Sequence, residues 1–172
     1  MGHLAELFAV DHKRAFEFFL MGLNDVCDRT VSENELMYNA SVLAHYAQTS
    51  TQSEDSWPTP STLSDVFDTF VIDRSLHQDS SMMEIAGAEC LLLTGFFGRQ
   101  MQRRHNISWY SKLGAGYFNR AAIWEKDTEK ARLLRALASN FESWRQRHKQ
   151  LSCVLRDQRY LLSTTPEVTP QN

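Results

Sequence analysis

The sequence is poor in the residues that interrupt helices. Its 172 residues include only 7 glycines and 4 prolines, and no stretch alternates apolar and polar residues as a half-buried strand does. The chain also lacks any run of about 18 uncharged apolar residues, so no transmembrane helix is expected. These absences exclude a strand-rich fold and predict an all-α protein.

Cysteine is scarce as well. Cys27, Cys90 and Cys153 are odd in number, lie far apart and form no Cys-x-x-Cys pair. A disulfide framework therefore does not fit, and three free thiols indicate a cytoplasmic protein. No secretory signal is expected either, because charged residues between Glu6 and Glu17 interrupt the apolar start of the chain.

Motifs that carry chemistry are also missing. None of the six histidines follows a glutamate by three residues, which is the spacing used by di-iron helical bundles, so no metal site is predicted. The chain has no Gly-x-Ser-x-Gly elbow for a nucleophile and no glycine-rich loop after a strand for phosphate. The sequence therefore predicts no cofactor and favours a non-enzymatic protein.

Helical periodicity, in contrast, extends over almost the whole chain. A hydrophobic fraction of 42% and a charged fraction of 23% fit a globular protein, predicted as a single domain over residues 1–162. A polar segment with Pro58 and Pro60 predicts an internal loop at 49–62, and the polar end predicts a disordered tail at 163–172. Ser32 and Glu35 have capping-box spacing. The expected fold is a bundle of about six helices.

One predicted helix, at about 80–103, is the expected centre of the bundle. Between Ile85 and Phe97 its apolar side chains point in every direction, which is typical of a helix that the others surround. Glu89 is the exception. A carboxylate buried there needs a partner or has a raised pKa, so it is either a candidate general acid or base or a structural ion-pair member.

A second predicted helix, at about 128–158 and capped by Asp127, carries a regular apolar seam. The seam alternates spacings of three and four residues: Leu134, Leu137, Phe141, Trp144, His148, Leu151 and Leu155. This is the pattern of a long helix in a bundle or a coiled coil, so we expect internal packing or a dimer through Leu134–Leu155. Burial on the seam would lower the pKa of His148.

Charge is divided unevenly along the chain. Residues 1–98 carry 15 acidic against 4 basic side chains, a net charge of −11, and residues 99–172 carry 14 basic against 6 acidic, a net charge of +8. The two halves can complement each other within one fold or between subunits. Alternatively, the basic half can meet an acidic partner.

The basic half begins in the stretch GFFGRQMQRRHNISWYSK, residues 95–112. Its candidate binding residues are Arg99, Arg103, Arg104, Trp109, Tyr110 and Lys112. The cations could hold phosphates and the aromatic rings could stack on bases, but a pI near 6.1 argues against a nucleic-acid-binding protein. The simpler interpretation is a buried helix that reaches the surface at Arg99, with at least two of the three arginines paired to carboxylates of the acidic half. Asn106 or Ser108 is expected to cap the next helix.

Two resemblances involve this stretch. Arg99 and His105 are five residues apart, which is similar to the Arg-x(4–6)-His motif of HEPN ribonucleases. These are all-helical enzymes, and the resemblance implies acid–base catalysis by His105 and phosphate binding by Arg99. The segment Cys90–Ala122 also resembles a stretch in uncharacterised bacterial all-helical proteins of unknown function. The matching residues are Tyr110, Leu113, Gly114 and Tyr117, and the resemblance implies a bacterial origin and no particular activity.

The sequence as a whole favours a non-enzymatic cytoplasmic interaction or regulatory protein that binds itself or another protein. The alternatives are a HEPN-like RNA-cleaving enzyme and a nucleic-acid-binding protein that uses the Arg99–Lys112 stretch. No metal, cofactor or membrane partner is predicted.

Overall fold

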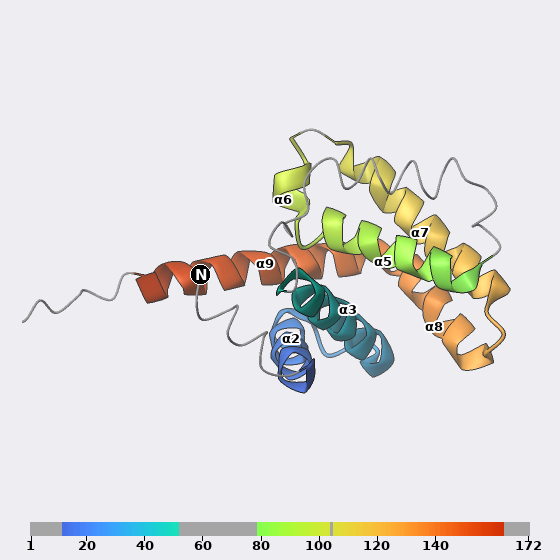
Figure 1. Ribbon diagram of the computed structural model, residues 1–172, viewed down its shortest axis with the longest axis horizontal. Helices are drawn as coiled ribbons and strands as arrows, with labels where there is room; N and C mark the ends of the chain where they lie inside the picture. Colours follow the sequence, from blue (N-terminus) through green and yellow to red (C-terminus); the bar gives the residue numbers. More distant parts are fainter. Residues whose placement is uncertain (1–11, 52–78, 104, 164–172) are drawn as a thin grey trace, which may run out of the picture.

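The computed structural model describes residues 12–51, 79–103 and 105–163, and every regular element in these ranges is helical (Figure 1). The helices are α2 (His12–Val26), α3 (Glu33–Thr51), α5 (Ser80–Thr94), α6 (Gly98–Met101), α7 (Ile107–Trp124), α8 (Thr128–Ser139) and α9 (Phe141–Ser163). The predicted all-α bundle is confirmed. Helix α3 extends through Thr51, so the predicted loop at 49–62 starts too early. The rest of that loop and residues 164–172 of the predicted tail lie outside the described residues.

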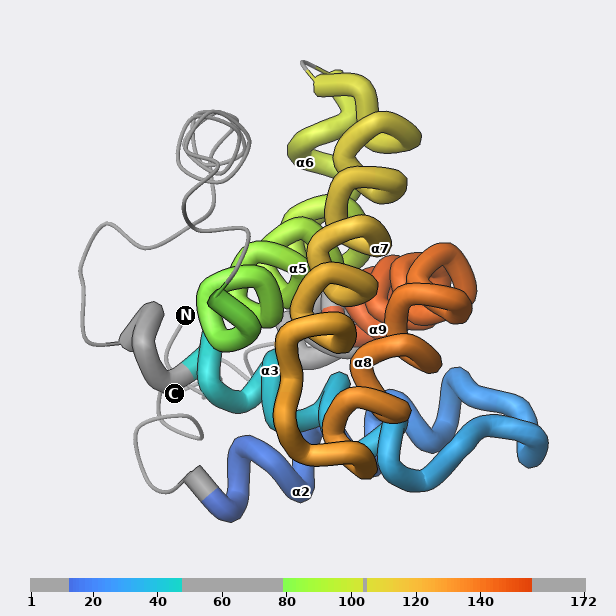
Figure 2. The backbone as a smooth tube through the Cα atoms, turned by 90° about the vertical axis from the view of Figure 1, so that its right-hand side faces the viewer, coloured from blue at the N-terminus to red at the C-terminus, as the bar shows by residue number. Residues whose placement is uncertain are grey.

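Two groups of helices meet along α9. Helices α2 and α3 lie side by side in both views, and in the other group α7 packs against both α5 and α8 (Figures 1 and 2). Each group has its own core. Core A joins α5, α7, α8 and the start of α9, and its members include Met83, Phe118, Leu134, Phe141 and Trp144. Core B joins α2 and α3 to α5 and α9, and its members include Leu23, Leu43, Leu92, Phe97 and Leu151.

The central helix α5 ends at Thr94 rather than near residue 103. A Cβ atom added at Gly95 would lie 2.8 Å from the Cβ of His148 and 2.9 Å from the carbonyl oxygen of Arg145. The backbone of α9 therefore passes so close to Gly95 that only glycine fits there. The periodicity of one helix cannot show this approach of another.

The long C-terminal helix is interrupted once, at Asn140, and so divides into α8 and α9. The interruption is a bend of one residue, because the Asn140 N–H still donates to the carbonyl oxygen of Ala136 at 2.9 Å and the Trp144 N–H donates to that of Asn140 at 2.9 Å. Helix α9 then continues to Ser163, beyond the predicted end near 158.

The apolar seam packs inside this one chain. Its six members from Leu134 to Leu151 are each no more than 2% exposed. The predicted burial of His148 is confirmed, and burial, which disfavours its charged form, lowers its pKa to about 3. Internal packing thus accounts for the seam, so a dimer, which stays a prediction, needs another surface.

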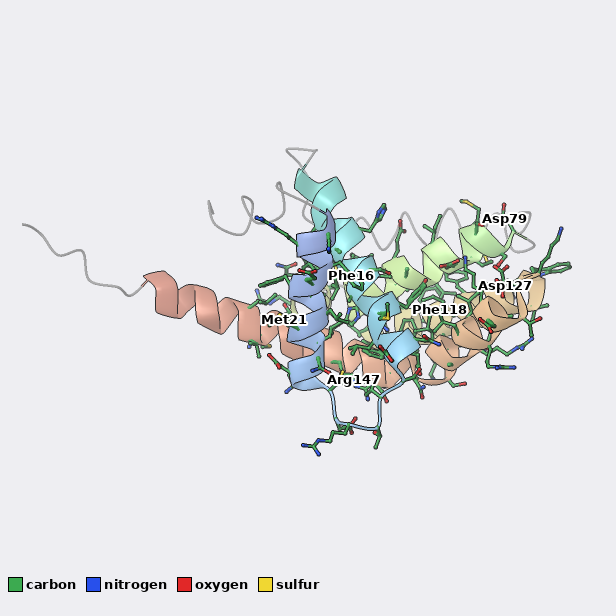
Figure 3. The ribbon with its side chains drawn as sticks, turned by 90° about the horizontal axis from the view of Figure 1, so that it is seen from below. Phe16, Met21, Asp79, Phe118, Asp127 and Arg147 are labelled. Carbon is green, nitrogen blue, oxygen red and sulfur yellow. The ribbon has the colours of Figure 1, made fainter. Side chains whose placement is uncertain are left out.

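Side-chain caps fix where several helices begin. Asn106 Oδ1 accepts from the backbone N–H of Trp109 at 3.1 Å, and Asp127 Oδ1 accepts from two backbone N–H groups at the start of α8, as the sequence predicted. Asp127 and the α5 cap Asp79 lie at the same end of the bundle (Figure 3). The predicted capping box of Ser32 and Glu35 is wrong, because the Glu35 carboxylate turns inward and accepts from α8–α9 side chains instead.

Candidate binding groove

An open groove of about 730 Å³ lies where the α6–α7 link faces the junction of α8 and α9. Its walls depend on the close approach of α7 to α5 and α9. A Cβ atom at Gly114 would lie 2.7 Å from the Cβ of Cys90 and 2.5 Å from the Cζ of Phe141. The groove is lined by Gly98, Gln102, His105, Asn106, Ile107, Ser108, Ser111, Lys112, Ala115, Ala138, Ser139, Phe141, Glu142, Arg145 and Lys149.

The charged lining of the groove is mainly basic. Lys112 comes from α7 and Arg145 and Lys149 come from α9, and they face a single carboxylate, that of Glu142, which gives a net charge of +2. Within the described ranges neither lysine forms an ion pair. The groove therefore has positive charge that its own wall does not neutralise.

Glu142 and Arg145 form a fixed pair in the wall. Arg145 Nε donates to Glu142 Oε2 at 2.9 Å, and Arg145 Nη1 donates to the carbonyl oxygen of Thr94 at 3.2 Å. Ser111 Oγ donates to the same Glu142 oxygen at 3.0 Å. The hydrogen bonds from Arg145 have the largest effect on the pKa of Glu142 and lower it to about 2. The hydrogen bonds from Gln146 and Ser111 act in the same direction with a smaller effect. A carboxylate with so low a pKa is a weak base, so this cluster holds charge rather than moving protons.

His105 forms part of the groove wall and is half-buried. Its backbone N–H donates to the carbonyl oxygen of Met101 at 3.1 Å, and its ring meets the Tyr110 ring edge-on with centroids 5.7 Å apart. The His105 Nε2 atom is enclosed and has no hydrogen-bond partner in the part of the chain that the structure describes.

The groove brings together only part of the predicted binding surface. Lys112 and His105 line it, whereas Arg99 and Arg103 are exposed outside it, and Arg104 lies outside the described residues. Neither Arg99 nor Arg103 forms an ion pair among the described residues. The expected pairing of at least two of the three arginines stays a prediction, because Arg104 and several carboxylates of the acidic half lie outside the described residues. At an exposed position such a pair stabilises little, about 0–1 kcal/mol, and hydration of the guanidinium replaces it.

The two aromatic residues of the predicted surface do not line the groove either. Tyr110 is 8% exposed and belongs to core A, so its face is not open to a nucleic-acid base. Trp109 is 41% exposed, and its ring meets that of Tyr110 edge-on at a centroid distance of 4.8 Å.

Glu89 does not fit its predicted role as a buried carboxylate. Its side chain is exposed, as is Ile85 one turn earlier, so this face of α5 is open to solvent rather than enclosed. Crowding by neighbouring groups still raises its pKa above the ordinary value, through partial desolvation. Glu89 lies outside the groove lining, and the structure gives no support for acid–base catalysis there.

Six charged or polar wall residues were not singled out from the sequence: Gln102, Ser111, Ser139, Glu142, Arg145 and Lys149. The last three come from α9, 30 to 37 residues beyond Lys112 at the end of the stretch that attracted attention. Their spacing of three and four residues places them on one helix face beside the seam, and this periodicity is the signal that could have found them.

No protein family, curated protein or solved structure matches this chain. The resemblances to HEPN ribonucleases and to uncharacterised bacterial proteins therefore stay predictions. In the ranges that the structure describes, no helix combines the length and apolarity needed to cross a membrane. The same ranges contain no group of three or more histidine, cysteine or acidic side chains placed to hold a metal ion.

Proposed function

We propose that the chain is a non-enzymatic interaction protein that binds an acidic segment of a partner protein in the basic groove. The observation that carries the proposal is the pair Lys112 and Lys149, two cations without ion-pair partners among the described residues, on either side of the groove. The one carboxylate in the wall is already held by Arg145. Acidic side chains are the complement of such a lining.

The start of α7 adds to this preference for an anion. Its first residues, Ile107 and Ser108, line the groove, and the exposed N–H groups of a first helical turn carry partial positive charge. This contribution is small beside that of the lysines, but it has the same sign.

The lining favours carboxylates over nucleic-acid bases. Proteins that bind single strands stack bases on open aromatic faces, and the Phe141 ring in this wall is only 2% exposed. A HEPN-like site would need Arg99 beside His105, and Arg99 is not part of the lining. We propose a cytoplasmic location, supported by the three free cysteines.

A fluorescence-anisotropy titration with a labelled, glutamate-rich peptide tests the proposal. The double variant Lys112→Glu/Lys149→Glu reverses the charge of the groove and should weaken binding by about tenfold or more at low salt. The matched control, Arg99→Glu/Arg103→Glu, makes the same change in net charge on exposed residues outside the groove and should have a much smaller effect. Added salt should weaken binding to the unmodified protein.

The alternatives give different results in the same experiment. Equal losses in the two double variants, or no loss in the groove variant, would contradict the groove as the binding site. Tighter binding of RNA than of the peptide, or cleavage of RNA, would support the nucleic-acid or HEPN-like function instead. A peptide-free dimer that dissociates as salt rises would identify the acidic partner as a second copy of the chain.

A further inference from the structure

Helices α2 and α3 meet the rest of the chain through the apolar side chains of core B and through a second set of contacts that is polar. On α3, Glu35 and Asn39 lie four residues apart on one face and are 6% and 0% exposed. Opposite them, also at intervals of four, lie Asn140, Trp144 and His148 at the α8–α9 junction and on α9. These five residues are referred to below as the polar ladder.

Hydrogen bonds connect the two sides of the polar ladder. Asn140 Nδ2 and Trp144 Nε1 donate to Glu35 Oε1, at 2.9 and 3.1 Å. Asn39 Nδ2 donates to the backbone carbonyl of Glu35 at 2.8 Å, which leaves Asn39 Oδ1 to accept from His148 Nε2, also at 2.8 Å. The network thus assigns the proton of the neutral His148 to Nε2. His148 Nδ1 is buried with no hydrogen-bond partner among the described residues.

Further polar contacts join the α2–α3 hairpin to α5 and α9, beside the apolar contacts of core B. Tyr38 Oη donates to Glu84 Oε1 on α5 at 3.0 Å, although the Tyr38 ring also meets the Phe118 ring edge-on. The loop after α2 contributes Asp28, whose Oδ1 lies 3.7 Å from Arg147 Nη2 on α9. Figure 3 shows Arg147 beside this loop, where the hairpin lies across α9. An interface that mixes apolar and polar contacts resembles those between parts of one chain that move relative to one another.

The connectivity of the chain permits such a movement. The hairpin precedes all the other described helices in sequence, so α3 is joined to α5 only through residues 52–78. Helix α2 packs mainly against α3 and meets α9 over a smaller area. The two helices can therefore stay together while they leave α9, and core A keeps most of its own contacts.

We propose that the α2–α3 hairpin undocks from α9 as one unit, and that the polar ladder, together with the apolar contacts of core B, holds it docked. Buried polar pairs add little net stability because they replace hydrogen bonds to water, whereas the loss of one partner leaves the others unsatisfied. Undocking gives water to the buried members of the ladder at once, including the orphan His148 Nδ1, whereas Asn140 is already exposed. It also uncovers the facing apolar side chains of core B, among them Leu43 on the hairpin and Leu151 on α9.

Hydrogen exchange followed by mass spectrometry tests this inference. The variant Asn39→Ala removes the acceptor of His148 and should speed amide exchange in α2 and α3 by about tenfold or more, while α5 and α7 keep the rates of the unmodified protein. Ser41→Ala is the matched control. Ser41 lies on the same helix, and its Oγ donates to the Tyr38 carbonyl within α3 rather than across the interface, so no selective change is expected.

Equal acceleration of all helices in Asn39→Ala would show a single cooperative unit and overturn the proposal. Unchanged exchange in the hairpin would overturn it as well, because the ladder would then not control docking. The unmodified chain gives an independent answer if the variant does not fold. Its hairpin amides must exchange faster than those of α5 and α7, and a common rate for both would also refute the idea.

Discussion

Helix α9 contributes to two polar regions that obey different physical rules. On one side Arg145 and Lys149 line an open groove, and on another His148 and Trp144 join the enclosed polar ladder. In the groove Lys112 and Lys149 stay hydrated, with no ion pair among the described residues, at little cost. Inside the protein each polar group needs a protein partner, since no water replaces it. Substitutions in the ladder should therefore change stability, whereas those in the groove should change binding.

Replacement of Trp144 by alanine should have the largest effect. Trp144 is fully buried in core A, and its Nε1 is one of the two donors to Glu35. Loss of the ring creates a cavity and removes one of the two side-chain hydrogen bonds that Glu35 accepts. We therefore expect the free energy of unfolding, measured with urea, to fall by about 3–5 kcal/mol. Trp124→Ala is the control, because that ring is 50% exposed and its loss should cost much less. Similar losses in both variants would contradict the enclosed, hydrogen-bonded position of Trp144.

The sequence predicted which residues of α9 are buried better than it predicted where the polar side chains lie. Periodicity identified Trp144 and His148 as buried because both fall on a repeat within one helix. Glu35, the carboxylate that is in fact enclosed, was assigned to a cap, and Glu89 was assigned to the interior. A helical wheel shows which residues share a face, but it does not show which neighbour covers that face. The same limit explains why Lys112 was found and Lys149 was missed: tertiary packing alone brings α9 to α7.

The pH dependence of stability should differ between His148 in the polar ladder and Glu142 in the groove, with a smaller effect than that of Trp144→Ala. The folded pKa of His148, about 3, lies below its ordinary value of 6.5, so its contribution is fully present above pH 6.5 and is lost as pH falls toward 3. The Glu142 contribution is lost only below its ordinary 4.5, toward about 2. Between pH 6.5 and 4.5 the part of the slope that His148→Gln removes should therefore report His148, approaching about 1.4 kcal/mol per pH unit. Glu89, whose raised pKa acts in the opposite direction above pH 4.5, contributes equally to both chains.

Urea denaturation at several pH values in this window, for the unmodified chain and for His148→Gln, measures that slope. The variant should have a flatter curve. Parallel curves would mean that His148 does not gain a proton on unfolding. They would contradict the burial of His148 away from water in the polar ladder.

The smallest change in stability is expected for the groove. Lys112→Ala and Lys149→Ala remove side chains that form no ion pair in the described part of the chain, so each should shift the free energy of unfolding by less than about 0.5 kcal/mol. Urea denaturation at pH 7 checks this. A loss above about 1 kcal/mol in either variant would mean that the groove lysines stabilise the fold itself.

The equal spacing of the polar ladder on both helices also determines alignment. Glu35 and Asn39 advance by four residues, and so do Trp144 and His148, so the two helices run in the same direction where they meet. A slip of one turn along α9 would carry Glu35 from Trp144 to His148 and leave two N–H donors without an acceptor. The small apolar residues that follow on α3, Ala40 and Ala44, offer no such discrimination. Each time α3 returns to α9, the polar side chains therefore select one register out of several that the apolar surface alone would accept.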